Sequence, residues 1–134
     1  MASLYLEAGA KSTNLSSALA SAEQIQRYAA QRRFDWEDVG AVLAKIEEEI
    51  SECRAVLSED ASQQARLHEL GDLLFSCVNL AQHLDVDPEL ALEAANRRFA
   101  EVERKLRAQG LQPGPETRAL MEVYWDQVKA GESL

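Results

Sequence analysis

The chain has 134 residues, of which 46% are hydrophobic and 28% are charged, and its formal net charge is −9. This length suits one domain with a single core, and the apolar content argues against a disordered chain. The acidic balance argues against nucleic acid as a partner, and no apolar run approaches the roughly 20 residues that span a bilayer.

Apolar residues recur at helical spacing along the chain, in segments separated by short polar breaks. No segment has the alternating pattern of a strand. We therefore predict an all-α fold, a four- to five-helix bundle with short connections. The expected helices cover residues 15–31, 36–57, 63–84, 88–110 and 116–129.

Local signals indicate where the helices and the domain begin. Asp35 is the expected N-cap of the second helix, and Asp87 followed by Pro88 marks the start of the fourth. Residues 1–13 are predicted to be loosely ordered, and residues 14–134 to form one domain.

The N-terminus and the cysteines indicate the cellular compartment in which the protein is expected. No basic region followed by an apolar block opens the chain, so a signal peptide is not expected. Cys53 and Cys77 fall on apolar helix stripes and are predicted to be small, reduced, buried side chains. We therefore expect a cytoplasmic protein without a membrane partner.

Two pairs of carboxylates lie in the expected second and third helices, Glu49 with Glu52 and Glu69 with Asp72. A spacing of three places each pair on one helix face. On a helical wheel, each pair lies about 60° to 140° to one side of the apolar stripe, so packing the stripes together can bring the pairs close. Solvated acidic flanks would have the same spacing. Four converging carboxylates would need a hard divalent cation such as Mg²⁺, which usually bridges to phosphates.

The segments around these carboxylates resemble the MazG-type nucleoside triphosphate pyrophosphohydrolases of the all-α NTP pyrophosphatase superfamily. The likeness is to the C-terminal catalytic domain of full-length MazG, and it extends over residues 15–130. The matching segments are Phe34-Asp35-Trp36 and residues 42–49, 71–75, 78–81, 95–99 and 125–129.

The resemblance implies Mg²⁺-dependent hydrolysis of a nucleoside triphosphate to its monophosphate and pyrophosphate, with Mn²⁺ as a substitute metal. Glu48 and Glu52 are the alternatives for the catalytic carboxylate that orients the attacking water, although the wheel places Glu48 on the opposite face. The implied metal ligands are Glu49, Glu52, Glu69 and Asp72. The implied substrate-binding residues are Lys45, Asn96, Arg98, Trp125 and Lys129, with Trp125 stacking on the base.

Some of these residues have plainer interpretations. Trp125 also fits a core anchor of the last helix, and Arg98 and Lys129 also fit solvated helix positions. The segment after Phe99 is about one helical turn shorter than in full-length members, so one phosphate-binding Arg has no clear counterpart, and Arg104 is a weak substitute.

The resemblance also bears on assembly and on competing functions. Full-length members carry two such domains in tandem, whereas this chain holds one. The resemblance implies a homodimer or homotetramer that assembles through its helices, with active sites near the interface. Two other interpretations stay open: a non-catalytic helical interaction module that retains the fold, and a pyrophosphohydrolase specialised for deoxypyrimidine or modified triphosphates.

Overall fold

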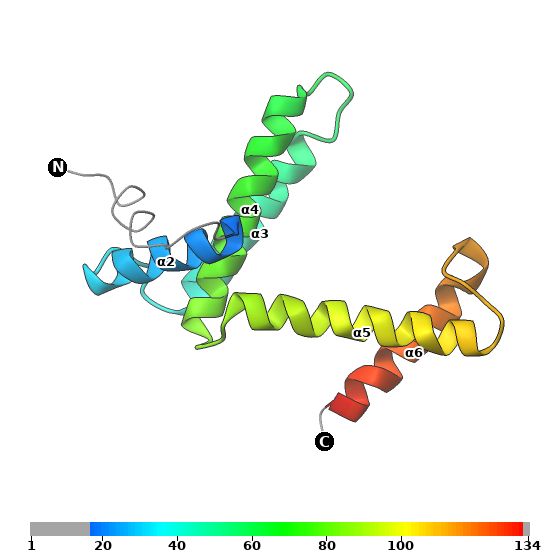
Figure 1. Ribbon diagram of the computed structural model, residues 1–134. Helices are drawn as coiled ribbons and strands as arrows, with labels where there is room; N and C mark the ends of the chain where they lie inside the picture. Colours follow the sequence, from blue (N-terminus) through cyan, green and yellow to red (C-terminus); the bar gives the residue numbers. More distant parts are fainter. Residues whose placement is uncertain (1–16, 133–134) are drawn as a thin grey trace. The chain divides into compact units, whose positions relative to one another are not determined.

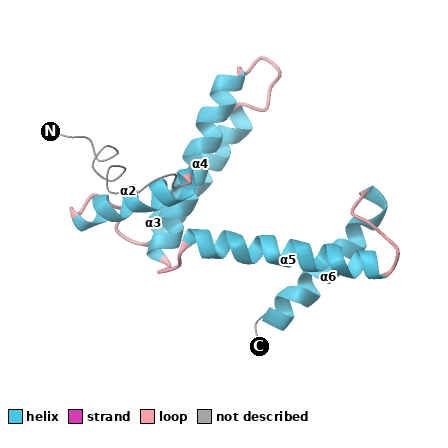
Figure 2. Cartoon of the chain, viewed as in Figure 1, coloured by secondary structure: helices cyan, strands magenta, loops and turns pink. Residues whose placement is uncertain are grey.

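The computed structural model describes residues 17–132, and these residues form helices joined by loops (Figures 1 and 2). The predicted all-α fold is confirmed, because no strand occurs in this part of the chain. The segment 1–13, predicted to be loosely ordered, lies outside the described residues. The elements are α2 (Ala18–Gln31), α3 (Val39–Ala55), α4 (Gln63–His83), α5 (Pro88–Ala108), the 3-10 helix η1 (Pro115–Thr117) and α6 (Arg118–Glu132).

The predicted cap of α3 is wrong by one helical turn. Asp38 is the N-cap, and its side chain accepts a hydrogen bond from the Ala41 N–H at 2.8 Å. Asp35 instead accepts hydrogen bonds from the side chains of Asn79 and His83 on α4. Either aspartate satisfies the local preference for a cap. The choice is made by partners more than 40 residues away along the chain, so α3 starts later than its sequence suggests.

Contacts divide the chain into two compact units, one ending at Glu89 and the other beginning at Leu90. In the first unit, α3 and α2 each pack against α4 (Figure 1). The prediction of one domain over residues 14–134 stays a prediction.

The buried face of α3 is rotated away from the centre of its apolar stripe. Val42 is 1% exposed and Glu49 is 5% exposed, whereas Leu43, Ile50 and Leu57 are exposed. At about 100° per residue, this places the centre of the buried face about 50° from the centre of the apolar stripe, toward the acidic edge. A carboxylate predicted at the edge of the helix therefore lies inside the interface with α4.

The partner helix α4 also exposes apolar side chains. Leu67, Leu70, Leu74 and Cys77 follow one another at spacings of three and four, which places them on one helix face. All four are exposed, so the prediction of a buried Cys77 is wrong. These four residues, together with Leu43 and Ile50 of α3 and Leu57 just after its end, are called the apolar residues of the α3–α4 pair below.

The second unit has its own small core. Val102 and Leu106 of α5 are 1% and 0% exposed, and they pack with Tyr124 of α6. The Tyr124 hydroxyl also accepts a hydrogen bond from Gln109 Nε2 at 2.6 Å. This core fixes how α6 lies on α5. Among the described residues, no helix combines the length and the apolarity that crossing a membrane requires.

Candidate functional site

Three carboxylates converge where α3 packs on α4: Glu49 from α3, and Glu69 and Asp72 from α4. One oxygen from each lies within 4.8 Å of the other two. Glu49 is buried, Glu69 is half-buried and Asp72 is exposed. The three residues, named the carboxylate cluster below, therefore reach from the helix interface to solvent.

The carboxylate cluster is electrostatically costly by itself. Two like charges 4.8 Å apart repel by about 3.5 kcal/mol at an effective dielectric constant of about 20. The surroundings must therefore supply positive charge. Lys45 supplies part of it, because its Nζ lies 2.8 Å from Glu49 Oε1.

The contact with Glu49 also favours the protonated form of Lys45. Its hydrogen bond to Glu49 is the main reason that the pKa of Lys45 is raised above its ordinary value, and a weaker one to Glu48 adds to it. Lys45 is therefore a cation at neutral pH and cannot act as a general base. It lies one helical turn before Glu49, so α3 itself positions the pair.

The two candidate catalytic carboxylates lie outside the carboxylate cluster. Glu52 is exposed on α3, one turn beyond Glu49, and is not within the group of three. The side chain of Glu48 is 61% exposed, with an oxygen 3.4 Å from Lys45 Nζ. The structure thus brings together three of the four predicted metal ligands.

The donor set of the carboxylate cluster suits a hard divalent cation. All of its donors are carboxylate oxygens, which are the ligands that Mg²⁺ prefers. Three protein ligands would leave coordination positions for water and phosphate, as is usual for this ion. The carboxylate cluster could therefore hold a metal ion.

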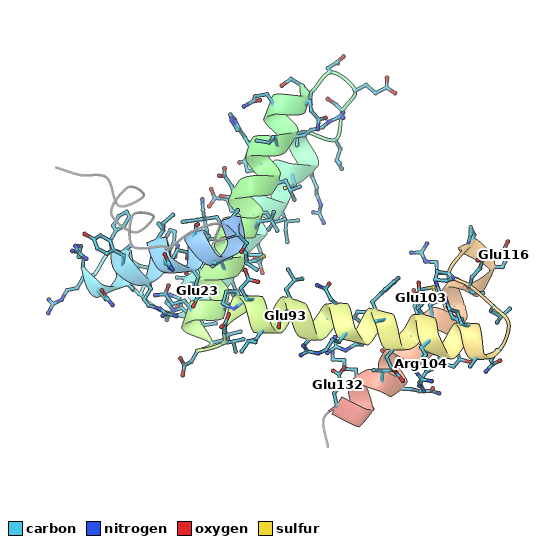
Figure 3. All side chains as sticks on the ribbon, viewed as in Figure 1. Glu23, Glu93, Glu103, Arg104, Glu116 and Glu132 are labelled. Atoms are coloured by element: carbon cyan, nitrogen blue, oxygen red, sulfur yellow. The ribbon has the colours of Figure 1, made fainter. Side chains whose placement is uncertain are left out.

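In the second unit, the predicted phosphate contact Arg98 is already engaged. Its Nε and Nη2 donate to Glu132 Oε2 at 3.2 and 2.7 Å, and its guanidinium lies 5.1 Å from the centre of the Trp125 ring. Glu132 is labelled near the end of α6 in Figure 3. Arg98 is therefore held in a fork geometry that also suits a phosphate oxygen.

The remaining predicted substrate residues lie on the same two helices. Trp125 is half-buried against the Val102 and Leu106 core, which gives it a packing role as well as a possible stacking surface. Asn96 on α5 and Lys129 on α6 are exposed. The sequence predicted these positions only through the resemblance.

A third group of polar residues was not predicted. Asp35 accepts hydrogen bonds from Asn79 Nδ2 at 3.2 Å, from His83 Nε2 at 3.1 Å and from the Trp36 N–H at 2.7 Å. Burial raises the pKa of Asp35, but these hydrogen bonds together hold it below the ordinary value. They tie the loop before α3 to α4. The spacing of four between Asn79 and His83 was the only available signal, and it does not name a partner.

Comparison with known proteins places the chain in a family. A family model described as phosphoribosyl-ATP pyrophosphohydrolase matches residues 20–99, which is more than half of the chain. The chain belongs to this family. The match includes the whole carboxylate cluster and Lys45, and it ends before Trp125 and Lys129.

Curated relatives are similar over most of this chain. A nucleoside triphosphate pyrophosphohydrolase of Escherichia coli (strain K12) is 44% identical over 120 residues, which are 86% of this chain and 46% of that protein. A nucleoside triphosphate pyrophosphohydrolase/pyrophosphatase MazG of Thermotoga maritima is 40% identical over 119 residues, 86% of this chain and 45% of that protein. The chain thus spans about half the length of the curated relatives it matches, and its resemblance to the MazG type is confirmed.

Proposed function

We propose that this protein hydrolyses nucleoside triphosphates to the monophosphate and pyrophosphate, with Mg²⁺ held by the carboxylate cluster. The convergence of Glu49, Glu69 and Asp72, with an oxygen of each within 4.8 Å of the others, carries the proposal. The names of its curated relatives support it. When bound, Mg²⁺ supplies Lewis-acid stabilisation of the polyphosphate charge, and Mn²⁺ can substitute for it.

The chain's own residues would orient the substrate and the water. We propose Glu52 as a fourth metal ligand. Either Glu52 or Glu48 would accept a proton from the attacking water. Lys45 and Arg98 would offset the negative charge of the polyphosphate chain.

Three residues that the resemblance implies as nucleotide contacts lie in the second unit. The indole of Trp125 offers a face on which any base can stack, with little selectivity. Asn96 and Lys129, exposed on α5 and α6, would add polar contacts to the nucleotide.

The proposed partner is a second copy of the chain, as a homodimer or homotetramer. The apolar residues of the α3–α4 pair are exposed within the described part of the chain, and such faces on two helices mark an interaction surface. Sedimentation at micromolar concentration tests this, since the mass of one chain would contradict it. The net charge of −9 disfavours nucleic acid as a partner, and we propose a cytoplasmic location.

The deciding experiment is a substrate panel. The protein is incubated with Mg²⁺ and each common ribo- and deoxyribonucleoside triphosphate, with deoxypyrimidine and modified triphosphates included. Phosphoribosyl-ATP is added because the family model is described by that substrate. We expect monophosphate plus pyrophosphate, and Glu69→Gln and Asp72→Asn should abolish the reaction.

The control variant is Glu122→Gln, which neutralises a carboxylate whose side chain is 74% exposed in the other unit. It should retain full activity. Diphosphate plus phosphate as products, or unchanged turnover in both cluster variants, would contradict the proposal. No turnover with any compound would favour the non-catalytic interaction module.

A further inference from the structure

The ion pair between Arg98 of α5 and Glu132 of α6 lies within the second unit and engages a predicted phosphate contact. Arg98 Nε and Nη2 lie 3.2 and 2.7 Å from Glu132 Oε2, so the carboxylate takes an edge of the guanidinium that suits a phosphate oxygen. Arg97, by contrast, pairs with Glu93 four residues away on its own helix. The contact between Arg98 and Glu132 therefore depends on how α6 packs on α5, and helical spacing alone does not produce it.

The two members of the pair differ in how firmly they are held. The side chain of Arg98 is 17% exposed, whereas that of Glu132 is 41% exposed. The Arg98 guanidinium also lies over the ring of Trp125, 5.1 Å from its centre, and Trp125 packs against the small core that contains Leu106. Glu132 can therefore turn into solvent while Arg98 keeps its packing.

Glu132 is also unfavourably placed in its own helix. It is the last residue of α6, where the negative end of the helix dipole disfavours a carboxylate and favours a cation such as Lys129. An exposed ion pair contributes little by itself, because solvent screens it. A polyphosphate has more charge and more acceptor oxygens than one carboxylate, so it can replace Glu132 on Arg98.

We propose that Glu132 is an internal competitor for the phosphate site of Arg98. It occupies the guanidinium in the free protein and leaves when the phosphate chain of a nucleotide binds. The proposal rests on the proposed function for the role of Arg98. It makes Glu132 a positioning residue that holds Arg98 over the Trp125 ring and weakens every ligand that uses this guanidinium by the same factor.

The first test measures binding without turnover. Inorganic tripolyphosphate is titrated in EDTA, at constant ionic strength, into the Trp36→Phe protein, in which Trp125 is the remaining tryptophan. Because Arg98 lies over the Trp125 ring, the loss of its contact with Glu132 should change the fluorescence of Trp125. Glu132→Gln in this background should bind tripolyphosphate about two- to fivefold more tightly, the size of an exposed ion pair.

Glu122→Gln is the matched control, because it removes the same charge from α6 at a residue that pairs with Arg118. Its affinity for tripolyphosphate should equal that of the reference protein. In an Arg98→Met background, Glu132→Gln should have no effect, because the partner of Glu132 is gone. Three results would each overturn the proposal: equal or weaker binding by Glu132→Gln, the same gain without Arg98, or no response to tripolyphosphate in any of the proteins.

The second test measures kinetics with Mg²⁺ and a nucleoside triphosphate. Glu132→Gln should lower KM by about two- to fivefold and leave kcat unchanged, because the competitor is removed equally from the bound state and the transition state. If Glu132 only held α6 on α5, its loss would lower Tm and leave KM unchanged or higher.

The two tests separate this proposal from the proposed function. If no triphosphate is hydrolysed, the proposed function fails, but tighter binding of tripolyphosphate by Glu132→Gln would still support Glu132 as the competitor. An active enzyme in which Glu132→Gln changes neither KM nor the affinity for tripolyphosphate would overturn the role of Glu132 alone.

Discussion

Neutralising Glu69 should stabilise the metal-free protein and remove its response to Mg²⁺. Glu69→Gln eliminates two like-charge interactions in the carboxylate cluster, those with Glu49 and Asp72, whose oxygens lie within 4.8 Å. Each interaction costs about 3.5 kcal/mol at a dielectric constant of about 20 and about 0.9 kcal/mol in water. Asp72 is exposed and Lys45 already neutralises part of Glu49. We therefore expect a gain of about 1–2 kcal/mol in the free energy of unfolding.

The assay is thermal unfolding followed by circular dichroism, in EDTA and in excess Mg²⁺. The gain should raise the Tm of the Glu69→Gln protein by about 3–6 °C in EDTA. Mg²⁺ at a hundred times its Kd should add about 2.7 kcal/mol to the wild type and almost nothing to the variant. Glu122→Gln should match the wild type in both conditions. A lower Tm in EDTA together with a wild-type response to Mg²⁺ would refute this account of the carboxylate cluster.

Three other changes have defined outcomes. Lys45→Met should tighten Mg²⁺ binding several-fold, because the Lys45 ammonium competes with the metal, and raise the nucleotide KM about tenfold, because a phosphate contact is lost. Isothermal titration measures the Mg²⁺ affinity and steady-state kinetics the KM, and a lower KM would contradict this prediction. Asp35→Asn should destabilise the fold by about 0.5–1 kcal/mol at neutral pH. Because folding lowers the pKa of Asp35, the difference in free energy of unfolding between wild type and variant should be complete above about pH 4 and vanish as the pH falls through the pKa of Asp35 in the folded state. A difference that persists at lower pH in acid denaturation would contradict this prediction. Leu74→Lys should yield monomers in sedimentation, and an unchanged oligomer would exclude the exposed apolar side of α4 from the interface.

The helices were predictable because their signals are local. Apolar spacing, Asp87 with Pro88 and the turn at Gly110 act within a few residues, and the structure has helices in all five predicted places. The convergence of Glu49 with Glu69 and Asp72 was also within reach, because the face of a helix follows from its period.

What could not be predicted depends on contacts between distant segments. The rotation of α3 that buries Glu49 and exposes Leu43 is decided by packing on α4. A helical wheel cannot predict this rotation, because it takes the centre of the apolar stripe as the centre of the buried face. The role of Asp35 depends on Asn79 and His83, which lie on another helix. The cavity between α2, the loop before α3 and α4 is lined by all three segments together, so no single segment carries its signature.

The ion pair between Lys45 and Glu49 would link the binding of a metal ion to the binding of phosphate. In the protein without metal, the ammonium group occupies the most deeply buried carboxylate of the carboxylate cluster and limits its repulsion. A metal ion bound through Glu49 Oε1 would compete with this ammonium group for that oxygen. The displaced charge would then lie one helical turn away, on a flexible side chain that can reach an incoming anion. Metal binding to the carboxylate cluster would thus free Lys45 to contact phosphate, so that the affinity for the phosphate chain would rise only after the metal has bound.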